Sequence, residues 1–264
     1  MSVFRTVNLP CPACGGEAEF ALVHSVNVDR RADLRDQILA ATFQQKPCPQ
    51  CGVEFRVDPE FNYLNLGRKQ WIAAWPRSAM AEWPEYAERA RESFNDAFGS
   101  EAPPSAQEMG KSITPRITFG WAALREKIFV RGAELDDVTV ELAKAALIRA
   151  SSASPVMTAE LRLLAIDGEE LVFGWVDSNN EKGFELNRVN RSLLAEIEGD
   201  AAAWEPLRKQ LSSEMFVDVT RLFMPPIEGA SAGESASANK KSKSATGKKA
   251  SAAKSAPSKK KKGK

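Results

Sequence analysis

Four cysteines in two closely similar turns are the residues whose types and spacing point most directly to chemistry. They lie in the sequences Cys11-Pro12-Ala13-Cys14-Gly15 and Cys48-Pro49-Gln50-Cys51-Gly52. Two residues between the cysteines let both sulfurs of a pair turn toward one point, and the glycine that follows permits the left-handed backbone of such a turn. Two such turns offer four thiolates, the closed tetrahedral set that zinc favours in structural sites. We therefore predict one structural metal ion, most simply Zn²⁺, on Cys11, Cys14, Cys48 and Cys51.

Two alternatives for the cysteines stay open. The same four thiolates also suit iron in a reducing compartment, so the choice of zinc rests on its preference for structural sites. A single Cys-Pro-X-Cys can instead be a thiol–disulfide redox motif, because the turn lowers the pKa of a thiol. Two copies, each followed by glycine, favour a shared metal site. The 33 residues between Cys14 and Cys48 exceed the roughly 15–20 of a simple zinc ribbon, and we expect a helix to be inserted there.

No catalytic residue can be assigned from the sequence. His24 is the only histidine, so no serine–histidine–acid set is indicated, and the thiolates already fill a metal's coordination sphere. Gly110-Lys111-Ser112 is similar to the end of a phosphate-binding loop, but Ser105 stands where that motif needs glycine. The prediction is a non-enzymatic protein, and the alternative class is an enzyme: a thiol oxidoreductase that uses the cysteine pairs, or a hydrolase with an unrecognised site.

The elements that must position the cysteines follow from hydrophobic periodicity and turn residues. Strands are predicted on both sides of the first pair and after the second, with a helix between them. Further helices, a β-hairpin at Asp167-Gly168 and a final strand are predicted downstream, and 99–115 is predicted as a connector between subdomains. The predicted strands are 7–15, 17–24, 53–57, 160–166, 170–176, 184–189 and 215–223, and the predicted helices are 31–43, 81–98, 120–129, 134–150 and 193–211.

The predicted fold class is α+β, in three parts. Residues 1–150 are expected to form a zinc-ribbon-like domain with a helical insertion and associated helices. Residues 151–228 are expected to form a small mixed α/β segment. Residues 229–264 are expected to be a disordered tail, because they contain mostly lysine, alanine and serine and cannot bury a core.

Several charged and aromatic residues admit two interpretations each. Acidic residues near 136–141 fit a helix start better than a carboxylate cluster, because they favour the positive end of the helix dipole. Glu126 and Lys127 are expected on a solvated face, with a packed ion pair as the alternative. Three tryptophans are expected in the core rather than on a binding platform: Trp71, Trp75 and Trp83.

Charge is distributed unevenly along the chain. The sequence has 36 Lys and Arg against 35 Asp and Glu, but 11 lysines and one acid lie after Gly229. Residues 1–229 therefore hold 25 basic and 34 acidic side chains, a net charge of −9. A lysine-rich tail gains affinity for DNA or RNA by releasing counterions, without sequence selectivity. It could equally contact the acidic body or an anionic membrane surface, or only confer solubility. The candidate contacts are Lys240, Lys241, Lys248, Lys249, Lys259, Lys260, Lys261 and Lys262.

The cellular compartment is predicted from the lengths of the apolar stretches and from the first residues of the sequence. No stretch approaches eighteen consecutive apolar residues, so no membrane span is expected. Residues 1–5 lack the apolar core of a secretory signal. We therefore expect a cytoplasmic, reducing location, where the cysteines are thiols or thiolates rather than disulfides.

The sequence resembles the CpXC family of bacterial and archaeal proteins, which takes its name from two Cys-Pro-X-Cys motifs. The similarity spans about the first 150 residues. Beyond the cysteines it includes 24–29, the predicted helix 33–43, Phe61-Asn62-Tyr63, 124–128 and 135–137. The resemblance implies a domain based on a zinc ribbon and supports the four metal ligands, but it implies no catalytic residue and no activity. The combined prediction is a zinc-binding interaction module with a protein or nucleic-acid partner.

Overall fold

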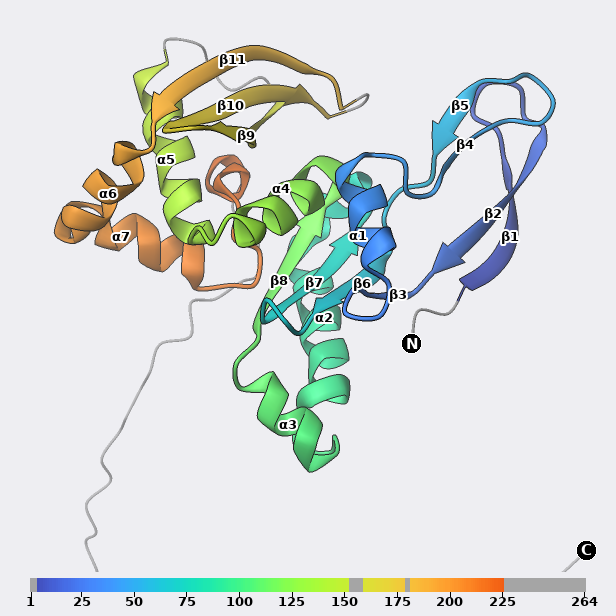
Figure 1. Cartoon of the computed structure of the whole chain (residues 1–264), viewed down its shortest axis with the longest axis horizontal. Helices are drawn as coiled ribbons and strands as arrows, with labels where there is room; N and C mark the ends of the chain where they lie inside the picture. Colours follow the sequence, from blue (N-terminus) through green and yellow to red (C-terminus); the bar gives the residue numbers. More distant parts are fainter. Residues whose placement is uncertain (1–3, 152–158, 179–180, 226–264) are drawn as a thin grey trace, which may run out of the picture. The chain divides into compact units, whose positions relative to one another are not determined.

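The computed structural model in Figure 1 describes residues 4–151, 159–178 and 181–225. These residues form a mixed α+β fold with seven α-helices and eleven strands, which confirms the predicted class. The described residues as far as Pro225 belong to one compact unit. Within them, no helix is long and apolar enough to cross a membrane. The eight candidate tail lysines lie outside the described residues, and the proposed limits at 150 and 228 stay predictions.

The cysteine pairs lie at the tips of two β-hairpins, here called the cysteine hairpins. In the first, β1 (Phe4–Pro10) pairs antiparallel with β2 (Glu17–Val23). In the second, β4 (Gln45–Pro47) pairs antiparallel with β5 (Glu54–Arg56). The predicted inserted helix is present between them as α1 (Ala32–Leu39). The strands and the helix that the sequence predicts around the cysteines are thus present: β2, β5 and α1 are shorter than predicted, and β1 begins and ends earlier.

A four-stranded sheet, not predicted from the sequence, takes one strand from between the cysteine hairpins and three strands from after them. Its order is β3-β6-β7-β8, with β3 and β6 parallel, β6 and β7 antiparallel, and β7 and β8 parallel. Because side chains alternate along a strand, neighbouring residues of β7 face opposite sides. Ile72 and Ala74 belong to one buried cluster, and Trp71 and Ala73 to another. The strands are β3 (Ser25–Asn27), β6 (Phe61–Asn65), β7 (Gln70–Trp75) and β8 (Thr114–Phe119).

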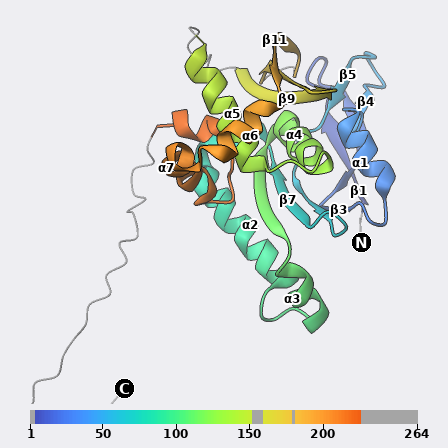
Figure 2. The ribbon, with the colours of Figure 1, turned by 60° about the vertical axis from the view of Figure 1, so that its left-hand side comes forward.

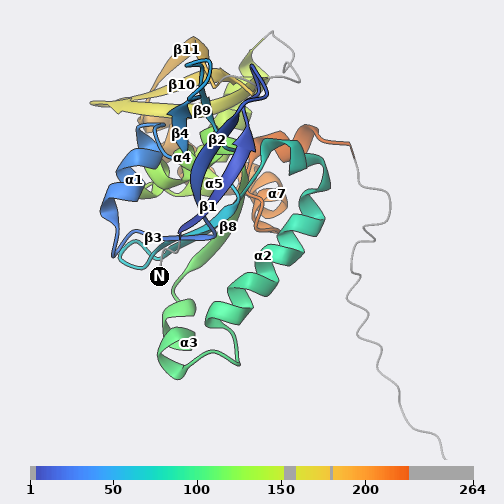
Figure 3. The same cartoon turned by 90° about the vertical axis from the view of Figure 1, so that its right-hand side faces the viewer.

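Helices cover both faces of this sheet (Figures 2 and 3). The first buried cluster includes residues of α1 and of α4 (Gly120–Gly132), so these two helices lie on one face. The second includes Ala87 and Ala90 of α2 (Trp83–Phe98), which lies on the other face after a 3-10 helix, η1 (Arg77–Glu82). Trp71 is buried in this second cluster, and Trp75 and Trp83 pack against it. The prediction that the three tryptophans belong to the core is confirmed.

The C-terminal part packs a helical layer on a three-stranded antiparallel sheet of order β11-β10-β9. Leu161, Leu171 and Phe173 of the sheet share a buried cluster with Val140 and Leu142 of α5. The hairpin predicted at Asp167-Gly168 is confirmed. The elements are α5 (Asp137–Ala150), β9 (Ala159–Asp167), β10 (Glu170–Asp177), β11 (Gly183–Asn190), α6 (Ser192–Gly199), α7 (Ala201–Ser212) and the 3-10 helix η2 (Val219–Phe223).

Two predicted features are wrong. The expected connector at 99–115 contains the helix α3 (Pro104–Gly110), and β8 beyond it pairs with β7 before it, so no subdomain boundary falls there. Pro104 begins α3, where proline is tolerated because its missing N–H would have no helical partner. The expected strand at 215–223 is an extended segment followed by η2. The carboxylate of Asp218 accepts a hydrogen bond from the N–H of Thr220 and so starts this turn instead.

Ten charged side chains, most of them buried, are linked by ion pairs and are here called the buried charge network. Glu126 and Lys127 belong to it, so the expected solvated face is wrong. The Glu126 carboxylate lies 2.9 Å from Lys144 Nζ and 2.9 Å from Arg162 Nη1, and Lys127 Nζ lies 3.0 Å from Glu141 Oε1. The network joins five acids and five bases through consecutive ion pairs: Glu126, Asp137, Glu141, Glu160 and Asp218 with Arg77, Arg116, Lys127, Lys144 and Arg162.

The acid side of the pH–stability profile should depend on this network. Burial alone would raise the pKa of Asp137, but Lys127 and Arg116 outweigh it and hold the pKa well below its usual range. A lowered folded-state pKa stabilises the fold above the unfolded-state value near 4, and that stability is lost as the pH falls further. We expect Asp137→Asn to lower the free energy of unfolding by about 2 kcal/mol at pH 6. The difference from the unmodified chain should shrink steadily between about pH 5 and pH 2.

Urea unfolding of both chains over this pH range measures that difference. Any protonation of the cysteines affects both chains alike, so it cancels in the comparison. A difference that stays constant with pH would contradict the role given to Asp137.

Candidate metal centre

The two cysteine turns have nearly the same backbone geometry. In the first, Cys11 N donates to Gly16 O at 2.8 Å and Gly15 N to Cys11 O at 2.8 Å. In the second, Cys48 N donates to Val53 O at 2.9 Å and Gly52 N to Cys48 O at 2.9 Å. Gly15 and Gly52 both have φ of +74°, which side chains rarely adopt. The glycine after each cysteine pair therefore lets the chain fold back behind the sulfurs.

Backbone amides point at the sulfurs in both turns. Ala13 N lies 3.4 Å from Cys11 Sγ, and Gly16 N lies 3.4 Å from Cys14 Sγ. Gln50 N lies 3.4 Å from Cys48 Sγ. Such N–H donors disperse the negative charge of thiolates that bind a metal ion. Both turns thus provide backbone N–H donors to their sulfurs.

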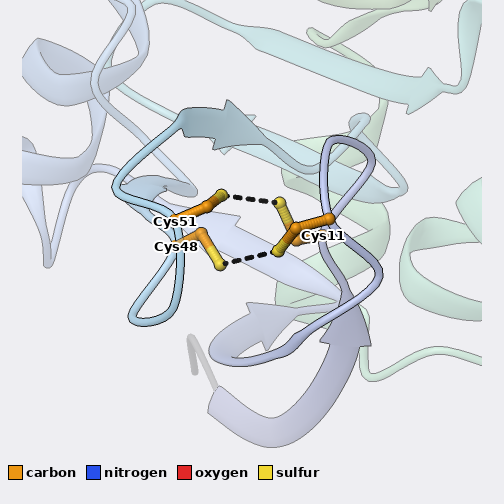
Figure 4. A group of neighbouring side chains, drawn as sticks. Cys11, Cys48 and Cys51 are labelled. Atoms are coloured by element: carbon orange, nitrogen blue, oxygen red, sulfur yellow. Dashed lines mark hydrogen bonds between the residues drawn. The ribbon is translucent and has the colours of Figure 1, made fainter.

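The four sulfurs converge on one point, as Figure 4 shows for the labelled side chains of Cys11, Cys48 and Cys51. Cys11 Sγ lies 3.8 Å from Cys51 Sγ, and Cys14 Sγ lies 3.7 Å from Cys48 Sγ. All four sulfurs lie within 4.8 Å of one another. Four thiolates at about 2.3 Å from a central ion would be about 3.8 Å apart. The arrangement fits a tetrahedral metal ion, and the four cysteines could hold one.

The thiols differ in exposure and in pKa. Cys11 and Cys48 are buried, whereas Cys14 and Cys51 are exposed. Hydrogen bonds from the N–H groups of Cys51 and Gln50 lower the pKa of Cys48 to about 7. The N–H of Gly16 lowers the pKa of Cys14, but the neighbouring Cys51 thiol and desolvation outweigh it and raise this pKa to about 12. The lower pKa of Cys48 means that its thiol ionises more readily than that of Cys14.

Contacts besides the sulfurs hold the cysteine hairpins against each other. The rings of Phe20 on β2 and Phe55 on β5 meet edge to face with centroids 5.0 Å apart. The ammonium group of Lys46 lies 4.9 Å from the centre of the Phe20 ring. Gly16 leaves room for the side chain of Gln50, which a Cβ would displace. These contacts are few, so the sulfurs occupy the centre of a small interface.

The second cysteine hairpin is anchored to α4, which sequence analysis did not foresee. Trp121 Nε1 donates to Val57 O at 3.0 Å, just beyond β5. The guanidinium of Arg56 lies 4.7 Å from the centre of the Trp121 ring, and Arg56 Nη1 donates to Ala41 O at 3.0 Å. A tryptophan at the start of a helix gives no sequence signal for such a contact. His24 is exposed and is not part of the cysteine cluster.

Comparison with known proteins supports the cysteine motifs. The family described as CpXC protein matches residues 9–144, which is just over half of the chain. The chain belongs to the CpXC family. Neither a search of curated proteins nor a search of solved structures gave a match.

The matched CpXC residues contain both cysteine turns, the strands β2, β4 and β5, the four-stranded sheet and the helices on its two faces. They also contain Glu126, Lys127, Glu141 and Lys144 of the buried charge network. The residues that complete the network lie beyond the match: Glu160, Arg162 and Asp218. In this CpXC chain, therefore, the residues matched by the family and the C-terminal part contribute to the same buried charge network.

Proposed function

We propose that the cysteine hairpins form a zinc ribbon with a helical insertion, in which Cys11, Cys14, Cys48 and Cys51 hold one structural Zn²⁺. The separation of the sulfurs carries this proposal, because 3.7 and 3.8 Å match the edges of a tetrahedron of thiolates around zinc. A disulfide would need sulfurs about 2.05 Å apart. The free thiols also support the proposal of a reducing, cytoplasmic location.

We further propose that the metal has a structural role and that the protein is a non-enzymatic interaction module. Four sulfurs occupy every position of a tetrahedral ion, so none is left for water or substrate. A protein partner is supported by Leu164 and Leu186 on the β9–β11 sheet, which are 42% and 59% exposed. Both side chains lie next to Gly174, so they form one apolar surface. Exposed apolar surfaces of this kind often mark contacts with other proteins.

Thiol titration of the folded chain tests the metal proposal. We expect the reduced protein to react slowly with an alkylating or disulfide reagent, because thiolates bound to zinc are protected. Addition of a chelator should expose four reactive thiols per chain and release one zinc ion. Urea-unfolded protein in chelator gives the full thiol count as the control. Four thiols that react rapidly before chelation, with no metal released, would contradict the proposal.

A thiol oxidoreductase is the second candidate, and the lowered pKa of Cys48 favours it. A thiol with a pKa of about 7 is partly ionised at neutral pH and can attack a disulfide. This candidate requires rapid alkylation of the folded protein and reversible disulfide formation within each pair. The same titration therefore separates the two candidates, because a zinc-bound set shows neither property.

We propose, in addition, that the tail binds DNA or RNA without sequence selectivity through Lys240, Lys241, Lys248, Lys249, Lys259, Lys260, Lys261 and Lys262. The eight candidate lysines could displace enough counterions for a slope of log K against log salt of about −7 at most. Fluorescence anisotropy with a short DNA duplex and a single-stranded RNA, at low and at physiological salt, measures this slope. Deletion of residues 230–264 should abolish salt-sensitive binding.

A full-length control with these eight lysines replaced by glutamine separates charge from tail length. It should behave like the deletion if charge drives binding. Binding that survives in both variants would remove the tail from the proposal.

A further inference from the structure

A cavity of about 670 Å³ is lined by residues outside the two cysteine hairpins. It opens between η1, the paired strands β9 and β10, and η2. Sites for small molecules are commonly about 300–1,000 Å³ in volume. The cavity is therefore large enough to enclose a small organic ligand.

Most of the cavity wall is apolar. Leu161 and Trp175 contribute buried side chains from the strands, and Met80 contributes a half-buried one from η1. Phe223 and Met224 line it at the end of η2, and Phe223 is 52% exposed. Methionine side chains adapt their shape to different apolar surfaces, and aromatic rings offer flat ones. This wall suits a hydrocarbon or aromatic ligand body.

One end of the cavity is polar and carries a fixed guanidinium. Arg77 forms an ion pair with Glu160 through Nε, and its Nη2 lies 3.5 Å from Ser178 Oγ. Glu160 is 4% exposed and is held from the other side by Arg162. Among the described residues, Arg77 Nη1 has no hydrogen-bond acceptor. Arg77 therefore presents N–H donors that a ligand oxygen can accept.

The charge at this end favours a ligand without charge. Arg77 is the terminal base of the buried charge network, in which five bases match five acids. Its positive charge is already matched by Glu160, and Asp58 adds an exposed carboxylate to the same cavity. An anionic ligand would meet both carboxylates at close range. A carbonyl or hydroxyl oxygen gains the free N–H groups of Arg77 without that repulsion.

We propose that this cavity binds a small, uncharged, mainly apolar molecule whose carbonyl or hydroxyl oxygen accepts hydrogen bonds from Arg77. The proposal is independent of the metal centre, because none of the cavity's lining residues is in the cysteine hairpins. It gives this chain a ligand-binding site whose wall combines η1 of the CpXC-matched residues with β9, β10 and η2 of the C-terminal part.

The full chain and the neutral fluorophore prodan test the proposal. Prodan combines an apolar naphthalene with a ketone, and its emission reports both burial and hydrogen bonding. We expect saturable binding of one prodan per chain with blue-shifted emission. The exposed Ala81 lines the cavity, so Ala81→Trp should fill its mouth and weaken binding at least about tenfold. Ala201→Trp on the exposed side of α7, which does not line the cavity, is the matched control and should leave binding unchanged.

Two further comparisons test the polar end. Arg77→Lys keeps the positive charge beside Glu160 but removes the planar guanidinium, so the affinity for prodan should fall about tenfold. The melting temperature should stay close to that of the unmodified chain. Decanol should displace prodan at lower concentration than decanoate. No saturable binding, or binding that Ala81→Trp leaves intact, would overturn the proposal. Stronger competition by decanoate would overturn its assignment of an uncharged ligand.

Discussion

Replacement of Arg162 by methionine is expected to lower the free energy of unfolding by about 3–5 kcal/mol. Arg162 is 2% exposed and contacts three carboxylates, those of Glu126, Glu160 and Asp218. Methionine preserves much of the side-chain volume but leaves these carboxylates without their shared cation. Removal of one partner from a buried ion pair is costly because the remaining charge stays desolvated. A loss of this size is a large fraction of the stability of an ordinary domain.

The same β-sheet offers a matched control. Arg188 on β11 also contacts two carboxylates, Asp167 and Glu170, but its side chain is 51% exposed. Water solvates the charges that Arg188→Met leaves behind, so we expect almost no change in stability. Urea unfolding of both variants, followed by circular dichroism, measures the contrast. Equal losses of unfolding free energy for the two substitutions would show that burial does not determine how much the network contributes to stability.

Replacement of Cys51 by serine is expected to unfold the cysteine hairpins while the rest of the chain stays folded. Strands β1 and β4 have no buried residue, and the Phe20–Phe55 contact is one of few between the hairpins. A metal ion bound as proposed would therefore supply much of the folding free energy of this part. The four-stranded sheet β3-β6-β7-β8 and the C-terminal part have apolar clusters to which, among the described residues, the cysteine hairpins contribute only Val23, so we expect these parts to stay folded.

Hydrogen exchange by mass spectrometry measures this local effect. Amides of β1, β2, β4 and β5 should exchange roughly 100-fold faster or more in Cys51→Ser, whereas those of α5 and β10 should not change. Cys51→His is the matched rescue, because histidine can replace one cysteine in a tetrahedral zinc site. We expect it to restore much of the protection. Protection in Cys51→Ser that equals that of the unmodified chain would contradict a structural metal ion.

The cysteine turns could be predicted from sequence because their geometry is local. The glycines at 15 and 52 and the spacing of the cysteines determine the backbone within five residues, and no distant contact is needed. The inserted helix and α5 could be predicted for a similar reason, because their apolar residues recur at helical spacing. What the sequence could not show is how the second cysteine hairpin is attached to α4 through Trp121.

The buried charge network could not be predicted, because each of its members looks like a surface residue in isolation. Glu126 and Lys127 are neighbours on α4, and charged residues on a helix usually face water. Their burial depends on partners from α5, β9 and the segment before η2, which only the complete fold brings together. The polar end of the cavity was missed for the same reason, because Arg77 and Glu160 are distant in sequence. Sequence patterns record local geometry better than long-range pairing of charges.

Native mass spectrometry of the reduced, folded chain tests the central claim most directly. The account predicts one zinc ion on the unmodified chain and none on Cys51→Ser measured in the same buffer. It also predicts that the zinc-loaded chain carries no disulfide, because all four thiolates bind the ion. A folded chain whose mass equals that of the polypeptide with four free thiols, or with two disulfides, would contradict the account.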